Sequence, residues 1–556
     1  MHASPGFSQI YTPKLFTALR SGYSLADMRT DMIAGLTVAI VAIPLSMAIA
    51  IASGAKPAAG LYATIVGGFL ISALGGSMFQ IGGPAGAFIV LVAKTIETHG
   101  FDGFVAATIM AGVILLILGY LNLGAYIKYI PHSATVGFTA GIAVIIFSSQ
   151  IKDLFGLAVD HEPAAFLPKL ETFWPARGTA SPTAIALAAG SLALILILRL
   201  WKPRFPGFLA VVVLGAALSW GFGLPVETIG SRFGDIPRTL PAPALPTISL
   251  HGLIELFPSA IAIALLGGIE SLLSAVVADG MTGRHHRSSC ELVAQGWANI
   301  VSALFGGLCC TGAIARTATN IRAGAHGPVA GILHAVFVAA LMAVAAPLAS
   351  HIPLATLAAL LTVVAWNMIE RDQILTLVKY DRGETFVFAT TMLLTIFRDI
   401  TEGIAAGVTL GSLLFVHRMA QVVEIKAETD NGATGDAAEE EDDDEGFQPA
   451  PQDAVVVYRI NGPFFFGVAS TISTVLDTIG PRPEAFILDL THVPLADAAA
   501  AHALHSFAQK TRRRKTPLYI VGAGRRVRRT LERNGIDETL ARYAESEQAA
   551  RQELGR

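Results

Sequence analysis

Two short glycine-rich segments lie far apart in the chain, and each has the composition of a helix start buried inside a membrane. One covers residues 80–88 and follows Gly75-Gly76; the other covers residues 310–317 and follows Gly306-Gly307. Interrupted segments at matching places in two halves of a hydrophobic chain point to a secondary transporter's substrate site. Irregular backbone at membrane depth is tolerated only where protein buries it or where it lines a cavity. We therefore expect a solute to bind between the two segments. The residues expected to contact it are Ala85, Gly86, Ala87, Phe88, Gly312, Ala313, Ile314 and Ala315.

An anion that leaves water needs hydrogen-bond donors in its site. A helix N-terminus supplies free backbone N–H groups and the positive end of a dipole, and small residues let the backbone approach the ligand. Arg316 lies one turn into the second segment and would add a positive charge. An arginine inside a membrane span is costly and usually functional. The alternatives are a structural partner role for Arg316 and, for either segment alone, ordinary packing of small residues between helices.

Glu270 lies in the middle of a long apolar stretch, and Ser274 follows one helical turn later. A carboxylate there repels an anionic substrate unless it is protonated or paired. Glu270 is therefore the candidate coupling residue, because a proton on it would permit the anion to bind. Ser274 could ligate a cation or orient the carboxylate. The alternative is a permanent ion pair between Glu270 and Arg316 with only a structural role.

The elements that must position these residues are expected to be membrane-spanning helices. Of the 556 residues, 53% are hydrophobic and 15% are charged, whereas about 25% of residues are charged in soluble domains. A soluble core does not produce about a dozen apolar stretches of the length that crosses a bilayer. We predict a polytopic α-helical membrane protein with about 14 spans. They are 31–52, 57–74, 80–97, 103–122, 130–150, 182–201, 207–224, 256–279, 291–309, 311–322, 327–349, 352–369, 383–398 and 401–419.

Positive charges indicate the orientation of these spans. With a cytoplasmic N-terminus, lysines and arginines gather in the loops that would face the cytoplasm, as the positive-inside rule requires; examples are Lys128, Arg204, Arg284 and Arg371. An even number of spans returns the C-terminus to the same side. Seven spans per half is an odd number, so we predict a 7+7 inverted repeat with half-helices at spans 3 and 10.

The ends of the chain differ in composition from its middle. An unbroken acidic run at 439–445 is typical of a solvated linker. Beyond it, predicted strands at 455–460, 485–490 and 517–521 alternate with helices at 468–479 and 497–510, which indicates a small α/β domain. The expected divisions are a cytoplasmic N-terminal segment (1–30) without a cleavable signal peptide, a transmembrane domain (31–422), an acidic linker (423–452), the α/β domain (453–545) and a tail (546–556).

Several stretches resemble one family in order along the chain. Residues 31–37 and 43–48 resemble its first span, 83–87 the opening of its third, 264–273 its eighth and 320–325 its tenth; the C-terminal part resembles a STAS domain. The family is the SulP anion transporters, which include prestin, pendrin and BicA. Residues 269–273 and 279–283 most resemble the bacterial C4-dicarboxylate transporters of the DauA type.

This resemblance implies a secondary active transporter that works by alternating access. Spans 1–4 and 8–11 would form a moving core, and spans 5–7 and 12–14 a scaffold and homodimer gate. Leu45 and Ile49 would face the substrate. In BicA-like sodium-coupled members an Asp is followed four residues later by Thr, where this chain has Glu270 and Ser274, so protons are favoured over sodium. The expected activity is proton-coupled uptake of C4-dicarboxylates such as succinate and fumarate across a bacterial inner membrane, with both termini in the cytoplasm.

Other functions stay open at this point. A sulfate:proton symporter or a sodium-coupled bicarbonate transporter would need the same kind of site, and a passive anion channel or a membrane scaffold for the STAS domain are different classes. We expect no enzyme, because no nucleophile–base set, metal cluster or phosphate-binding motif is evident. Cys290, Cys309 and Cys310 resemble neither a disulfide framework nor a zinc site, and no cofactor, metal or nucleic acid is expected.

The STAS tail could still meet a cytoplasmic partner. Where some STAS domains carry a phosphorylatable serine after an aspartate, this chain has Ala498 after Asp497, so a phosphorylation switch is not expected there and Asp497 is read as a helix cap. The basic stretch 511–515 fits anionic lipid, a partner or a solvated face.

Overall fold

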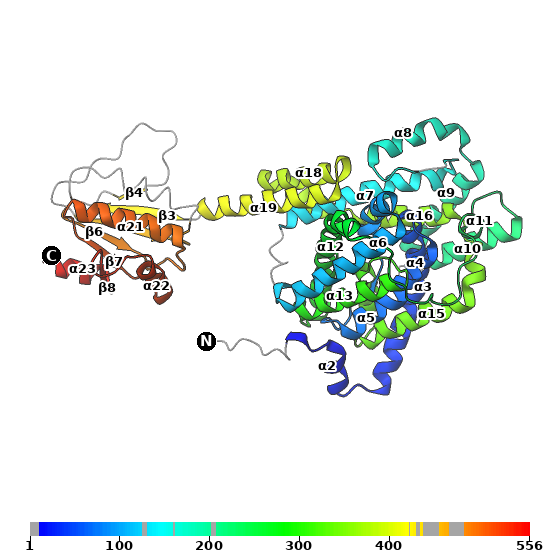
Figure 1. Cartoon of the computed structure of the whole chain (residues 1–556), viewed down its shortest axis with the longest axis horizontal. Helices are drawn as coiled ribbons and strands as arrows, with labels where there is room; N and C mark the ends of the chain where they lie inside the picture. Colours follow the sequence, from blue (N-terminus) through cyan, green and yellow to red (C-terminus); the bar gives the residue numbers. More distant parts are fainter. Residues whose placement is uncertain are drawn as a thin grey trace. The chain divides into compact units, whose positions relative to one another are not determined.

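The computed structural model describes residues 10–124, 131–159, 162–201, 207–421, 423–429, 434–436, 455–465 and 483–555. The chain forms two compact units, Met1–Gly411 and Ser412–Arg556. The first unit is helical and the second is built on a sheet (Figure 1).

One group of helices in the first unit is built from both halves of the sequence. In Figure 1 the blue helices α3 and α6 lie beside the green helices α15, α12 and α13. α6 packs mainly against α13 and α12, and α3 packs against α15. We call this group the core bundle. Its members are α3 (Leu25–Ala52), α4 (Pro57–Tyr62), η1 (Ala63–Gly67), α5 (Gly68–Leu74), η2 (Gly86–Phe88), α6 (Ile89–Tyr120), α12 (Leu250–Thr282), α13 (Ser288–Leu304), α14 (Ile314–Arg322) and α15 (Val329–Ala349).

A second group, the scaffold bundle, surrounds α7 and α16. α7 packs against both α16 and α18, and α16 packs against α9. Its members are α7 (His132–Phe155), α8 (Phe166–Ala176), η4 (Arg177–Thr179), α9 (Pro182–Trp201), α10 (Gly207–Phe222), α11 (Ile229–Phe233), α16 (Leu354–Met368), α17 (Arg371–Tyr380), α18 (Arg382–Phe397) and α19 (Ile400–Gln421). The two bundles match the predicted division into spans 1–4 with 8–11 and spans 5–7 with 12–14. α2 (Lys14–Arg20) precedes the core bundle.

Helix starts and stops follow local chemistry. Ser24 caps α3 in a capping box, since its hydroxyl accepts from the Asp27 N–H while the Asp27 carboxylate accepts from the Ser24 N–H. Gly156 ends α7 and Gly283 ends α12, both in the left-handed conformation that glycine adopts without strain. Such signals are why most predicted span limits lie within a few residues of the observed helices.

Nine helical stretches among the described residues are long and apolar enough to cross a membrane. Predicted spans 3 and 4 run together in α6, where Gly100 makes a kink with φ 71°. α14 has 9 residues and α10 has 16, which is shorter than a full bilayer crossing of about 20 residues. The fold is thus a helical membrane protein, and the count of fourteen spans stays a prediction.

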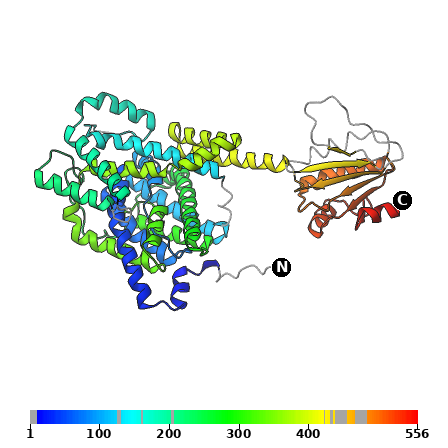
Figure 2. The ribbon, with the colours of Figure 1, turned by 180° about the vertical axis from the view of Figure 1, so that it is seen from behind.

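The second unit contains a six-stranded sheet in the order β4-β3-β5-β6-β7-β8 (Figure 2). β5 to β8 are parallel, whereas β3 pairs antiparallel with β5 and β4 with β3. α21 and α22 pack on one face and α23 on the other. The elements are β3 (Glu424–Thr429), β4 (Thr434–Asp436), β5 (Val455–Asn461), β6 (Ala485–Asp489), α21 (Ala498–Arg513), β7 (Leu518–Val521), α22 (Arg525–Arg533), β8 (Arg542–Ala544) and α23 (Glu547–Glu553).

The three predicted strands are observed as β5, β6 and β7. Asp497 caps α21 as expected, because its carboxylate accepts from the Ala500 N–H at 2.8 Å. The segment 423–452, expected to be a linker, differs at its start: β3 and β4 lie within it and extend the sheet beyond β5. The acidic run 439–445 and the predicted helix 468–479 lie outside the described residues.

Candidate functional site

The two glycine-rich segments meet in the middle of the core bundle. β1 (Gly82–Gly83) pairs antiparallel with β2 (Thr311–Gly312), with Gly82 opposite Gly312 and Gly83 opposite Thr311. η2 and α6 follow β1, and α14 follows β2. The short ladder satisfies backbone groups that would otherwise be unpaired within the bundle.

Glycine is required in this ladder by close packing. A Cβ on Gly312 would lie 1.4 Å from Gln80 Nε2, and one on Gly82 would lie 2.3 Å from Ile71 Cδ1. Gly83 has φ 155°, and a Cβ there would lie 2.1 Å from Arg316 Nη1. The glycines therefore bring the two segments and Arg316 together.

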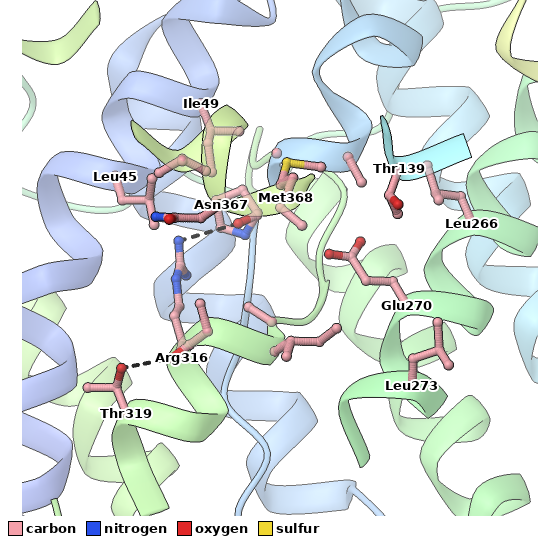
Figure 3. Close-up of a pocket in the computed structure, with 18 of the residues that line it drawn as sticks. Leu45, Ile49, Thr139, Leu266, Glu270, Leu273, Arg316, Thr319, Asn367 and Met368 are labelled. Atoms are coloured by element: carbon pink, nitrogen blue, oxygen red, sulfur yellow. Dashed lines mark hydrogen bonds between the residues drawn. The ribbon is translucent and has the colours of Figure 1, made fainter. Parts of the chain in front are cut away.

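A cavity of about 400 Å³ lies where the two helix starts face the scaffold bundle. The core bundle contributes α3, α12 and the two helix starts, and the scaffold contributes α7, α10 and α16 (Figure 3). Most of the wall is apolar. The lining residues are Val38, Val41, Leu45, Ile49, Pro84, Ala85, Gly86, Ala87, Thr135, Phe138, Thr139, Phe208, Leu266, Ile269, Glu270, Leu273, Ala313, Ile314, Ala315, Arg316, Thr319, Val364, Asn367, Met368 and Glu370.

Arg316 and Glu270 reach this cavity from opposite sides, on α14 and α12 (Figure 3). Arg316 is 3% exposed, and its Nη2 donates to Ser46 Oγ at 3.1 Å and to the Pro84 carbonyl at 3.3 Å. Its Nε and Nη1 have no hydrogen-bond partner among the described residues, and neither has Glu270 Oε2. The two side chains therefore do not bond to each other in this structure, and their three unpartnered atoms are buried beside the cavity.

Ten of the thirteen residues predicted for the site line the cavity. Three do not. Phe88 is buried beneath it, with its ring tip 3.5 Å from where a Cβ on Gly267 would lie. Gly312 is used in the ladder. Ser274 is buried, and its hydroxyl donates to Thr317 Oγ1 at 3.2 Å, which in turn accepts from the Ile81 N–H at 3.1 Å. Ser274 thus joins α12 to α14 behind the site.

Sequence reasoning missed the polar groups that the scaffold bundle contributes. Thr135 and Thr139 lie on α7, and Asn367 lies at the end of α16. These residue types are common in membrane helices and no local motif marks them. The sequence could have pointed to them only through their positions near the ends of spans 5 and 12. Those spans belong to the scaffold, which the predicted division places opposite the two helix starts.

The chemistry of the cavity fits an anion. Two helix starts and a buried guanidinium supply positive charge and donors. Hydroxyl and amide groups lie on the opposite wall together with the Glu370 carboxyl group, and Glu270 adds a second carboxyl group. No group of three or more His, Cys, Asp or Glu side chains that could hold a metal ion occurs in the part of the chain that the structure describes.

Comparison with solved structures identifies the fold class. The structure of SLC26A9 aligns with a TM-score of 0.85 and 17% identity, covering 98% of this chain and 92% of that chain. The transmembrane domain of the cyanobacterial bicarbonate transporter BicA aligns with a TM-score of 0.62 and 29% identity, covering 69% of this chain and 98% of that one. The chain therefore has the fold of a multi-pass helical membrane transporter.

Sequence comparison then gives the family. The sulfate permease family profile matches residues 28–391, and the STAS domain profile matches residues 448–550. The putative sulfate transporter YvdB of Bacillus subtilis is 39% identical and covers 94% of this chain and 96% of its own length. The bicarbonate transporter BicA of Picosynechococcus is 29% identical over 91% of each. The chain belongs to the sulfate permease (SulP) family: it is an anion transporter with a C-terminal STAS domain, and not an enzyme.

Proposed function

We propose that the protein couples the uptake of a C4-dicarboxylate to protons by alternating access. The observation that carries the proposal is the pair of unbonded groups at one cavity, Arg316 and Glu270, between two helix starts. Two donor nitrogens of Arg316 have no protein partner among the described residues and are buried beside the cavity, while the third donates to Ser46 and Pro84. A protonated Glu270 removes the negative charge that would repel the anion, so anion and proton bind together.

The size and the lining of the cavity support an organic anion. At about 400 Å³ with mostly aliphatic walls, it leaves room for hydrocarbon between two carboxylates, whose burial beside Leu45 and Ile49 is favourable. Sulfate and bicarbonate are the alternatives, favoured by the names of YvdB and BicA. Both would use the helix starts and Arg316 but little of the apolar wall.

Protons are favoured over sodium by the placement of Ser274. A sodium ion needs several oxygen ligands around it, and the Ser274 side chain is buried against Thr317 behind the site and does not line the cavity. Glu270 thus lacks the nearby hydroxyl that a cation site at this place would use.

The proposal also covers the membrane in which the protein lies, its orientation and its oligomeric state. We place it in a bacterial inner membrane with both termini in the cytoplasm, as a 7+7 inverted repeat that forms a homodimer, with the STAS domain free to dock a cytoplasmic partner. The division into a core bundle and a scaffold bundle supports movement of the first against the second.

Uptake into proteoliposomes tests the proposal. Labelled succinate, sulfate and bicarbonate are offered separately, with an imposed proton or sodium gradient. The expected result is succinate accumulation driven by inward protons and saturable with concentration. Sodium-driven bicarbonate uptake, or proton-driven uptake of sulfate alone, would overturn the substrate claim. Passive flux without accumulation would indicate a channel.

A further inference from the structure

A buried carboxylate outside the cavity lies behind both helix starts. Glu291, near the start of α13, is 0% exposed. Its Oε2 accepts from the backbone N–H groups of Gly76 and Ser77 at 2.9 and 3.2 Å, and its Oε1 accepts from Gln295 Nε2 at 3.0 Å and Ser271 Oγ at 3.3 Å. All four donors are neutral, so the carboxyl group serves here as an acceptor of hydrogen bonds and not as a partner in an ion pair.

Three of the four groups that donate hydrogen bonds to Glu291 lie close in sequence to the first helix start or to Glu270. Gly76 and Ser77 form the turn just before β1. Ser271 is the neighbour of Glu270 on α12, and its hydroxyl and carbonyl also accept from Gln80 Nε2 at 2.8 and 3.2 Å. One carboxylate therefore ties the approach to β1 and the backbone next to Glu270 to the same point on α13.

The second helix start is tied to the same face of α13. Asn299 lies two turns after Glu291, with Gln295 between them, and residues four apart share a helix face. Asn299 Oδ1 accepts from the Cys310 N–H at 2.9 Å and its Nδ2 donates to the Cys310 carbonyl at 2.8 Å. Cys310 directly precedes β2. This stripe of three polar residues, Glu291, Gln295 and Asn299, thus bonds to the segments leading into both strands.

We propose that Glu291 is a positioning residue for transport, which with Asn299 fixes the two helix starts and Glu270 relative to one another. It touches no part of the cavity wall and acts through Ser271 and the 76–77 turn. The kinetic test of this inference rests on the proposed function, because it measures transport. The structural test measures hydrogen exchange and needs no substrate.

The role depends on hydrogen bonds, which makes two substitutions at one position informative. In Glu291→Gln the new amide oxygen can still accept from Gly76 and Ser77. The new amide nitrogen replaces Oε1, so Gln295 must turn its amide to present its Oε1, which has no partner among the described residues, and the Ser271 hydroxyl must accept instead of donate. In Glu291→Leu the two backbone N–H groups and the Ser271 hydroxyl lose their acceptor, and a buried donor without a partner is destabilising.

Hydrogen–deuterium exchange on the full-length protein tests the positioning directly. We expect amides of residues 78–83 to exchange about tenfold faster in Glu291→Leu and within about twofold of wild type in Glu291→Gln, since a tenfold change corresponds to about 1.4 kcal/mol. Asn299→Leu should act mainly on residues 309–313. Thr108→Val, a buried change on α6 whose hydroxyl bonds only within its own helix, is the control and should alter neither segment.

Transport kinetics supply the second readout. Glu291→Leu should raise the KM of the transported anion about tenfold, whereas Glu291→Gln should keep both KM and the pH dependence of uptake. A purely structural role would lower Vmax through loss of folded protein and leave KM unchanged, and that result overturns the proposal. So does unchanged exchange at 78–83 in Glu291→Leu. If that variant does not fold, Ser271→Ala decides by the same exchange measurement. A wild-type protein that moves no anion would refute the proposed function while the exchange result still judges this inference.

Discussion

At the scale of single residues, the site depends on two ionisable side chains, Arg316 and Glu270, that line one cavity but are not bonded to each other. A salt bridge between Arg316 and Glu270 would use up both groups. Instead Arg316 is held by Ser46 and the Pro84 carbonyl, neither of which neutralises it. Its charge stays available to an anion, and Glu270 stays available to a proton.

Replacing the coupling carboxylate should separate anion movement from proton movement. In Glu270→Gln the side chain keeps its size but carries no charge and takes up no proton. We expect acid-driven accumulation to be abolished, whereas exchange of labelled for unlabelled anion persists with little dependence on pH. The measurement is uptake and exchange in proteoliposomes between pH 5 and 8. Accumulation against a gradient by this variant would show that Glu270 is not the coupling residue.

Arg316→Lys should weaken anion binding although it keeps the charge. A lysine has one nitrogen, so it cannot both replace the bonds to Ser46 and Pro84 and keep two unpartnered donors for an anion. We expect the KM to rise by roughly tenfold to a hundredfold with the amount of folded protein unchanged, because a bonded charged group contributes about 1.5–3 kcal/mol. Arg322→Lys, an exposed change at the end of the same helix, is the matched control. Equal KM values for the two variants would remove Arg316 from the binding site.

At the scale of elements, the short ladder between β1 and β2 sets the geometry of the site. Its backbone leaves no room for side chains at Gly82, Gly83 and Gly312, and Arg316 occupies the space beside Gly83. A substitution in the ladder should therefore displace the Arg316 guanidinium more than it alters the rest of the fold.

Gly83→Ala tests this dependence. The new Cβ would strain a backbone at φ 155° and displace Arg316 Nη1, which lies 2.1 Å from its position. We expect anion affinity to fall at least tenfold and the melting temperature to fall by a few degrees, since strain of this kind costs about 1–3 kcal/mol. Gly190→Ala on α9, where no atom lies within 4 Å of the new Cβ, should change neither. An unaltered affinity in Gly83→Ala would mean that the guanidinium position does not depend on the ladder.

Most helices could be predicted from sequence because apolar length and glycine or proline punctuation mark them locally. The glycine-rich segments also marked both helix starts. The inward orientation of individual residues could not be read in the same way. Ser274, four residues after Glu270, was expected beside it, yet its side chain packs against α14, where it donates to Thr317, and does not line the cavity. Asn367 and Thr139 reach the cavity only through the packing of α16 and α7 against the core bundle, which no local pattern records.

At the scale of the whole membrane unit, the two bundles meet through few polar side-chain contacts. Among the described residues, the Lys94 ammonium on α6 pairs with the Asp399 carboxylate between α18 and α19, and Glu97 Oε2 accepts from the Ala164 N–H at 3.2 Å. Lys94 and Glu97 lie one turn apart on the same face of α6. Both contacts must break if the core bundle moves away from the scaffold at that end.

A charge exchange across this contact tests its role in the movement. Lys94→Asp should speed uptake by about two- to fivefold, the size expected for a partly exposed ion pair, because the contact no longer has to be broken, and the double variant Lys94→Asp with Asp399→Lys should restore the wild-type rate. Lys56→Asp, at an exposed lysine of the core bundle, controls for charge reversal alone. Failure of the double variant to restore the rate would indicate that the pair does not bear on the movement.

The ladder between β1 and β2 also has a consequence for how the protein is made. Its paired residues Gly82 and Gly312 are 312 − 82 = 230 positions apart in the sequence, and ribosomes add about 5–20 residues each second. The first strand therefore waits about 12–46 s in the bilayer before its partner is synthesised, with backbone groups that lipid cannot satisfy. The ladder can therefore form only after more than half of the chain has been made, and the cavity only after α16 has followed it.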